Sequence, residues 1–391
     1  MKLFPFALAT LLSLPLFAQV IDVTGARKNN KDPISLSRLA AADPVFKQTL
    51  QSDLERSGYF YIDANAQTAV SGSASFANVT WSGGKLEWPN AKTPADARQD
   101  PRRGAHDLAD QIVQQIKRKP GMASSRVLFI KRNGPDNSDL YVCDADGANI
   151  QQLTFDNRAI VGPRWDTDSK NLFLTSYING GPVVYRMAAE PRAKKSIIAN
   201  YKGLNTGAAP SYDGKSIALI LSVLGNPDLF VLNRATGNHT QITKTPNASE
   251  ASPVWSPDNQ SILYVSDASG APHIYLANVA SKQSRRLTSS GSENVSPAWS
   301  FASNRIAYAS KRDGKYQIAV LNSISDARPV ILTSGAEHTD PTWMPDGRHL
   351  ICVRTDSPQS SSLWMLDTEG DKPVLLFTRP GKWASPASSF R

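Results

Sequence analysis

The sequence of 391 residues contains only two cysteines and five histidines. Cys143 and Cys352 are far apart and both lie in apolar runs, so we expect buried free thiols. Two such cysteines provide neither a disulfide framework nor a metal site. No two histidines have the His-x-x-x-His spacing or a comparable spacing of metal ligands. These shortages exclude a disulfide-stapled fold and the common zinc-enzyme motifs.

Long apolar runs and catalytic motifs are also missing. After the first twenty residues no segment is long and apolar enough to form a membrane-spanning helix. There is no Gly-x-Ser-x-Gly motif, and the chain leaves no room for a hydrolase domain of the prolyl-oligopeptidase type. The net charge of +9 comes from Lys and Arg that are interleaved with acids, unlike the concentrated charge of a nucleic-acid binder. We therefore expect a solvated basic surface that attracts acidic partners or anionic lipid.

The first eighteen residues have the pattern of a secretory signal peptide. Lys2 gives a positive start, an apolar stretch of mostly Leu, Phe and Ala follows, and Ala18 suits the position before a cleavage site. Leu16 fits its position less well, so the cut can shift slightly. Residues 1–18 are predicted to be a signal peptide, with an uncleaved anchor as the alternative. No cysteine follows the cut, so we expect no lipid anchor there and export to the periplasm.

A repeat of about 44 residues organises the chain from Arg126 onward. Each unit has a proline, a nearby aromatic residue, a turn and then two apolar strands, and generally ends at a threonine. This length is typical of a four-stranded propeller blade, and six copies predict a six-bladed β-propeller over residues 123–391. The prolines that open the units are Pro163, Pro210, Pro253, Pro297, Pro341 and Pro386.

Two further features of the repeat suggest how the ring is built. Trp165, Trp255, Trp299 and Trp343 recur two residues after a repeat proline, so we expect them to pack between blades and not to line a sugar site. The first unit lacks its own Pro-aromatic strand, whereas an orphan copy stands at residues 383–387. We therefore expect the end of the chain to supply the inner strand of the first blade, which removes open sheet edges.

Residues 19–122 do not follow the repeat. Asp43 and Pro44 are typical of a helix start, and Gly58 is expected to end that helix. A strand at 59–62, a hairpin between residues 70 and 88, and a second helix over 105–117 complete a small α/β domain. The fold predicted is therefore an α/β N-terminal domain followed by an all-β six-bladed propeller.

Several segments resemble the TolB family of Gram-negative bacteria. They are Pro-Val-Trp-Ser-Pro-Asp-Asn at 253–259, Pro-Thr-Trp-Met-Pro-Asp-Gly at 341–347, and Asp-Leu-Glu-Arg-Ser-Gly-Tyr-Phe at 53–60. The resemblance implies a non-catalytic periplasmic adaptor of the Tol–Pal envelope system, which supports outer-membrane integrity and cell division. It also implies two partners, the lipoprotein Pal at the propeller mouth and TolA at the N-terminal segment. The N-terminal domain is shorter than is usual in the family.

The resemblance assigns binding residues by position. The TolA-binding segment corresponds to Gln19, Val20, Ile21, Asp22 and Val23, an apolar run suited to strand addition at a sheet edge. The loops before the inner strands are expected to form the Pal-binding mouth, through Asn205, Thr206, Ser252, Asn294, Ser296, His338 and Asp340. No cofactor, metal or nucleic acid is implied. The protein is expected to be monomeric alone and to associate with the envelope through its partners.

Two alternatives remain open on the sequence alone. A carbohydrate-active propeller, of the polysaccharide-lyase kind, would need several His or acidic ligands at the channel, and only His338 with Glu337 and Asp340 offers such a group. A solute-binding periplasmic propeller is the second alternative. Asp144 and Asp146 stand just before Gly147, where a turn is more typical than a calcium site.

Overall fold

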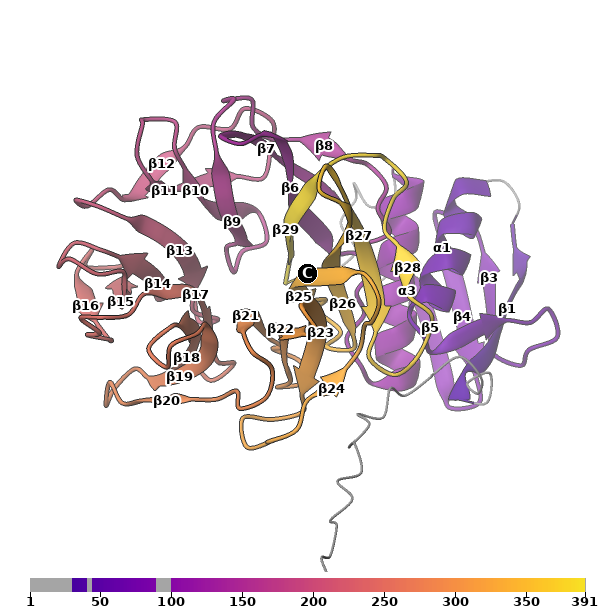
Figure 1. Ribbon diagram of the computed structural model, residues 1–391. Coiled ribbons are helices and arrows are strands. Elements are labelled where there is room, and N and C mark those ends of the chain that lie inside the picture. Colours follow the sequence, from indigo (N-terminus) through magenta and orange to yellow (C-terminus); the bar gives the residue numbers. More distant parts are fainter. Residues whose placement is uncertain (1–29, 41–43, 89–99, 391) are drawn as a thin grey trace, which may run out of the picture.

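The computed structural model describes residues 30–40, 44–88 and 100–390, and it has two parts (Figure 1). A small α/β domain lies beside a ring of six four-stranded sheets. The predicted fold class is therefore confirmed. The predicted signal peptide, the segment Gln19–Val23 and the helix-capping Asp43 lie outside the described residues. Within the described part, no helix has the length and apolarity needed to cross a bilayer.

The N-terminal domain is built on a five-stranded sheet of order β2-β1-β3-β4-β5. Its strands are β1 (Asp32–Leu39), β2 (Phe60–Ile62), β3 (Ala69–Gly72), β4 (Ala77–Trp81) and β5 (Gly84–Trp88). The predicted strand at 59–62 and the hairpin that ends at residue 88 are confirmed. Strand β1, which pairs in parallel with both β2 and β3, was not predicted.

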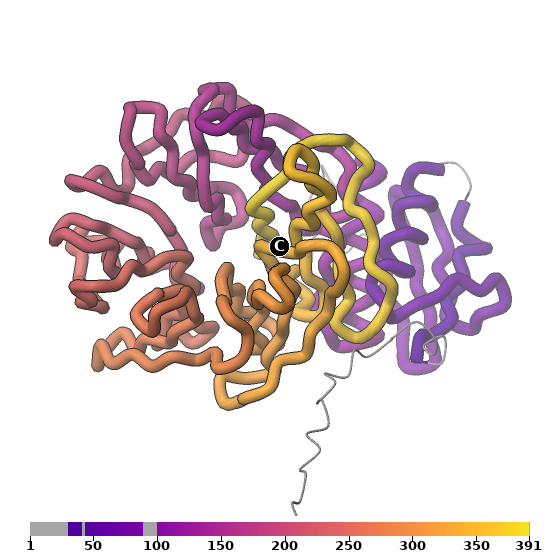
Figure 2. The backbone as a smooth tube through the Cα atoms, viewed as in Figure 1, coloured from indigo at the N-terminus to yellow at the C-terminus, as the bar shows by residue number. Residues whose placement is uncertain are grey.

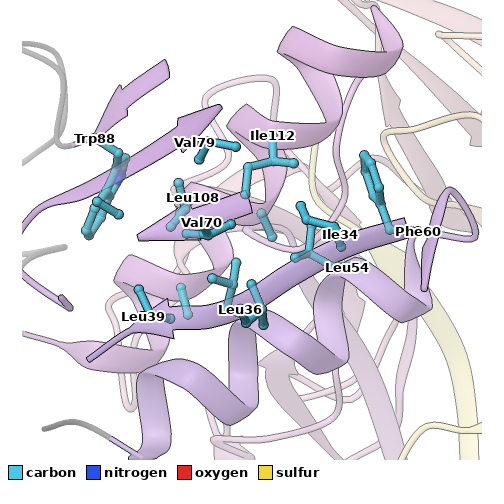
Figure 3. Packing of buried hydrophobic residues seen from close by; sticks show 14 of the residues in the cluster. Ile34, Leu36, Leu39, Leu54, Phe60, Val70, Val79, Trp88, Leu108 and Ile112 are labelled. Atoms are coloured by element: carbon cyan, nitrogen blue, oxygen red, sulfur yellow. The ribbon is translucent and has the colours of Figure 1, made fainter. Parts of the chain in front are cut away.

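Two helices pack against this sheet, α1 (Pro44–Arg56) and α3 (Pro101–Lys117). Helix α3 begins four residues earlier than predicted because Asp100 caps it and accepts hydrogen bonds from the backbone N–H groups of Arg102 and Arg103. Apolar residues at helical spacing bury one face of each helix in a shared core with the sheet. Figure 3 shows Leu54 of α1 and Leu108 and Ile112 of α3 meeting Ile34, Val70 and Val79 of the sheet.

Six antiparallel sheets form the propeller, each with its inner strand at one edge. The first three blades are β29 (Trp383–Ser388), β6 (Arg126–Gly134), β7 (Asn137–Asp144), β8 (Gln151–Gln152); β9 (Ile160–Trp165), β10 (Asn171–Ser176), β11 (Val183–Ala188), β12 (Ser196–Ala199); and β13 (Asn205–Pro210), β14 (Ser216–Leu221), β15 (Asp228–Asn233), β16 (His239–Gln241). The last three are β17 (Glu250–Trp255), β18 (Ser261–Ser266), β19 (His273–Asn278), β20 (Ser284–Arg286); β21 (Asn294–Trp299), β22 (Ile306–Arg312), β23 (Lys315–Leu321), β24 (Val330–Ile331); and β25 (Glu337–Trp343), β26 (His349–Ser357), β27 (Ser360–Asp367), β28 (Val374–Leu375).

The end of the chain closes the ring, as the repeat predicted. Strand β29 pairs with β6, so the first blade combines strands more than 230 residues apart in sequence. In Figure 2 the yellow end of the chain lies alongside the first blade, and the C-terminus sits near the centre of the ring. Ser389 continues this contact, because its hydroxyl accepts a hydrogen bond from the backbone N–H of Arg126 at 2.9 Å.

The repeated tryptophans pack between blades, which confirms their predicted role. Trp165, Trp255 and Trp343 each donate their indole N–H to a backbone carbonyl on the inner strand of the preceding blade, at 3.0–3.2 Å. Trp299 bonds instead to the Asn304 side chain in the turn of its own blade. All four rings are buried, so these tryptophans belong to the core of the ring. The two cysteines are buried and free, as expected.

The N-terminal domain is held to the propeller through blades 1 and 6. The Arg348 guanidinium of blade 6 lies 4.8 Å from the centre of the Tyr59 ring, and Lys31 forms an ion pair with Asp371 at 2.6 Å. On the other side Arg102 of α3 pairs with Asp146 of blade 1. Because Asp146 also accepts from the backbone N–H of Ala148, this loop is a turn anchored to the N-terminal domain, as its sequence indicated.

Candidate partner-binding mouth of the propeller

A backbone bulge recurs at the start of every inner strand. In all six blades the pairing of the inner strand with its neighbour shifts by a residue at the same place. The first bulged residue has a φ between 50° and 72° in each blade, a conformation that ordinary side chains rarely adopt. These residues, here called the bulge ring, are Gly162, Gly207, Ser252, Ser296, Asp340 and Ser385.

The bulge corrects one assignment made from the repeat. Five of the repeat prolines follow the bulge ring directly, where no ladder hydrogen bond is needed. In the third blade this place is held by Ala208, and Pro210 lies two residues further on, paired with Ile217 where four of the other blades pair a tryptophan. Pro210 therefore does not open its unit. The turn that follows Pro210 has the same four positions as the turns at 256–259 and 344–347, with Tyr212 where those turns have a proline.

The bulge ring lies at the third or fourth residue of the inner strands, toward the end of the central channel where the fourth strand of one blade leads into the next inner strand. We call this end the binding mouth. Bulges turn side chains away from the sheet, and Ser252, Ser296 and Asp340 are partly exposed here. The Ser296 hydroxyl donates to a carboxylate oxygen of Asp340 at 2.7 Å and so joins two neighbouring blades. Thr206 bonds to Thr175 of the adjacent blade at 3.2 Å.

The other residues expected at this mouth are buried. Asn205 is 1% exposed and bonds to the backbone of Tyr201 and Gly203. Asn294 is fully buried and bonds to His273 and to the Ser290 carbonyl. The structure thus brings all seven residues to one mouth, but it places these two asparagines beneath the surface, where they support the loops.

The His338 group does not assemble as a catalytic site would. The His338 ring nitrogen lies 3.0 Å from the Ala336 carbonyl in its own loop, and burial lowers the pKa of His338. Asp340 is engaged with Ser296. The three residues considered for sugar cleavage are thus occupied by structural contacts.

One buried acid at this mouth was missed by the sequence analysis. Glu250, 2% exposed, stands three residues before Pro253, the place held by Asn205, Asn294 and His338 in other blades. This position in the repeat, equivalent to that of three residues predicted at the mouth, could have identified Glu250 from the sequence. Its carboxylate accepts from Thr245 at 2.8 Å and from Ser266 at 3.1 Å, and the same Thr245 hydroxyl lies 3.0 Å from Asp228. Burial raises the pKa of Glu250 to about 7, and Asp228 adds to that rise although Thr245 opposes it.

Glu250 is expected to make the protein less stable as pH rises from about 4.5 to about 7. Across this window the folded state keeps the proton that an unfolded glutamate releases, so stability falls with increasing pH, by the order of 1–3 kcal/mol. Glu250→Gln should flatten this slope and should be more stable than the wild type at pH 8. Urea denaturation at several pH values measures both effects. Identical slopes in the two proteins would contradict the assignment.

A second buried cluster lies away from the mouth, between the two domains. Asp53, His106 and Asp146 are the one group of possible metal ligands found among residues 30–40, 44–88 and 100–390. The His106 Nδ1 atom lies 2.6 Å from Asp53. Burial alone would lower the pKa of His106, but Asp53 outweighs it and raises the pKa. Since Arg102 already pairs with Asp146, the cluster has the balanced charges of a structural ion-pair network.

These features define a class of protein: a six-bladed β-propeller closed by its own last strand, with a small α/β domain docked at blades 1 and 6. The TolB beta propeller domain family matches residues 113–390, which is well over half of the chain. The chain therefore belongs to the TolB beta propeller family.

Individual relatives agree with this family. The Tol-Pal system protein TolB of Bordetella parapertussis is 29% identical over 287 residues, covering 65% of this chain and 64% of the relative. TolB of Bordetella pertussis is 31% identical over 178 residues, covering 45% of this chain and 40% of the relative. The chain thus spans less than two thirds of the length of these relatives.

A solved structure shows the same fold over nearly the whole chain. The crystal structure of TolB from Acinetobacter baumannii superposes with a TM-score of 0.79 at 22% identity. The match covers 92% of this chain and 96% of that one. At this identity the likeness establishes the two-part fold, including the N-terminal domain that the family match does not reach.

Proposed function

We propose that this protein is a non-catalytic periplasmic adaptor of a Tol–Pal system, with a role in outer-membrane integrity and cell division. In this proposal the binding mouth of the propeller holds the lipoprotein Pal, and Gln19–Val23 add as a strand to TolA. The observation that carries the proposal is the family match together with the similarity to Tol-Pal system proteins. The resemblance of the N-terminal residues to a signal peptide supports the periplasm as the compartment.

The geometry of the mouth supports a binding role. Each blade presents one bulged residue at the same depth, so a partner would meet a ring of backbone and short polar side chains. The Ser296–Asp340 pair offers a carboxylate and a hydroxyl at the edge of that ring. We propose Thr206, Ser252, Ser296 and Asp340 as contacts for Pal, with the buried side chains of Asn205, Asn294 and His338 holding the loops.

Binding of purified Pal to the protein tests this proposal. Ser296→Ala combined with Asp340→Ala is expected to weaken Pal binding by about tenfold or more, because it removes two polar contacts from the bulge ring. Lys215→Ala is a matched control, since that side chain is 81% exposed on a turn at the opposite end. Calorimetry measures both affinities. If the unaltered protein has no affinity for Pal, the proposed function is wrong.

The TolA contact is tested separately. Deletion of residues 19–23 should abolish capture of the protein by immobilised TolA and leave the Pal affinity unchanged. Loss of both interactions would instead indicate a general defect, and unchanged TolA capture would exclude this segment.

A further inference from the structure

The end of the channel opposite to the binding mouth encloses a cavity of about 510 Å³. It lies between the turns that join the first and second strands of the blades, and this end is called the turn end here. The edges of the four repeat tryptophans line it. Tyr212 packs there between Phe301, tilted at 36° with ring centres 5.0 Å apart, and Phe390, which it meets edge to face at 5.6 Å. A cavity of this size with an apolar lining is typical of small-molecule sites.

Arg164 and Asp168 are the charged residues in the lining of this cavity, and Asp168 is paired with Arg186, whereas Arg164 breaks the symmetry of the inner strands. The residue just before the repeat tryptophan, or before the residue in its place, lines the cavity in all six blades. Five blades place an uncharged and mostly small residue there, and the second blade places an arginine. The six residues are Arg164, Ala209, Val254, Ala298, Thr342 and Ala387. The ring closes without an arginine at the five other positions, so packing of a blade does not require it.

The Arg164 guanidinium has no partner of its own among the described residues. Its side chain makes no hydrogen bond or ion pair with them, and the negative charge that acts on it is the Asp340 carboxylate. Asp340 is hydrogen-bonded to Ser296, and the Tyr212 hydroxyl donates to the Trp299 carbonyl at 3.0 Å. Partial burial lowers the pKa of Arg164, because surroundings of low dielectric constant disfavour the charged form.

We propose that this cavity binds a small organic monoanion, a carboxylate with an apolar body, whose carboxylate pairs with Arg164. A guanidinium binds a carboxylate through two parallel hydrogen bonds, and the aromatic walls provide apolar contact for the rest of the ligand. A single cation near the negative charge of Asp340 favours one negative charge over two. The cavity extends from the turn end as far as Pro297 and Pro341, which directly follow Ser296 and Asp340 of the bulge ring. Binding of the anion is measured on the protein alone, without Pal, so the proposal does not depend on the proposed function.

Matched pairs of ligands test the proposal on the full-length mature protein. The probes are octanoate with octanol, and phenylpropanoate with phenylpropanol, which differ in the carboxylate and share the apolar body. Calorimetry measures affinity, and quenching of tryptophan fluorescence reports whether the ligand reaches the cavity. We expect each acid to bind at least about tenfold more tightly than its alcohol, because one charge-assisted contact is gained.

Variants of Arg164 then locate the contact. Arg164→Gln should remove the preference for the acids, Arg164→Lys should keep part of it, and Arg285→Gln, at an exposed site, should leave it unchanged. Thermal unfolding checks that each variant is folded, and the comparison of acid with alcohol on the unaltered protein needs no variant. The proposal is overturned if neither acid binds better than its alcohol. It is also overturned if folded Arg164→Gln binds the acids as tightly as the unaltered protein.

Discussion

A chain that ends at Lys382 is expected to lose cooperative folding of its propeller. The deleted strand β29 supplies four pairing positions to β6, and without it the first blade has no inner strand. It also removes Trp383, which is 1% exposed and packs against Phe129, Tyr141 and Phe377 with ring centres 5.3–5.8 Å apart. Loss of one buried tryptophan typically costs about 3–5 kcal/mol, a large part of the 5–15 kcal/mol that stabilises a typical protein.

The second blade is also affected by this deletion. Trp165 donates its indole N–H to the Ala387 carbonyl, so the truncation leaves a buried donor unsatisfied in the next blade. Urea denaturation followed by far-UV circular dichroism is the measurement. A chain that lacks only Arg391 is the control, and a synthetic peptide of residues 383–391 added in trans should partly restore the transition. An unchanged midpoint in the truncated chain would show that β29 does not close the ring.

The propeller could be predicted because its blades place the same residue types at the same structural positions. The threonine at the end of the fourth strand illustrates this. Thr154, Thr243, Thr288 and Thr333 each accept a hydrogen bond from a backbone N–H of the third strand, at 2.9–3.1 Å. A hydroxyl in this place satisfies an N–H where the short outer strand stops pairing. The repeat revealed the position of the threonine, and the structure supplies its cause.

What the sequence did not predict depends on contacts between distant segments. Strand β1 has mixed polar and apolar residues, and its parallel partners β2 and β3 follow it only after a helix or a further strand. No local pattern marks such a strand. The third blade differs in a similar way, because Tyr212 takes the place of a turn proline and its aromatic contacts lie across the channel in other blades.

Counting back from the repeat prolines located the loops that lead into the inner strands, and that these loops bind a partner stays a proposal. The bulge decides which side chains are accessible there. It points Ser296 and Asp340 away from the sheet and leaves Asn294 fully buried. The repeat shows that Arg164 differs from its equivalents in other blades, but only the structure shows that this position lines a cavity.

Arg348→Met is expected to destabilise the protein by about 3–5 kcal/mol, because it leaves a buried carboxylate without its partner. The side chains of Arg348 and Asp367 are 7% and 3% exposed, and they are joined by hydrogen bonds of 3.0 and 2.5 Å. Burial acts to raise the pKa of Asp367, but the hydrogen bonds from Arg348 outweigh it and lower the pKa. The same guanidinium covers the Tyr59 ring, so the variant also weakens the contact between the domains.

A double variant separates the lost pair from the lost packing. Arg348→Met combined with Asp367→Asn removes both charges, so its cost should be well below the sum of the single variants, by about 1–3 kcal/mol. Arg285→Met, at an exposed arginine, is the control and should change stability by no more than about 0.5 kcal/mol. Urea denaturation of the four proteins gives the coupling energy. Additive effects would mean that the two side chains act independently, and that Arg348 stabilises the junction through its contact with Tyr59 alone.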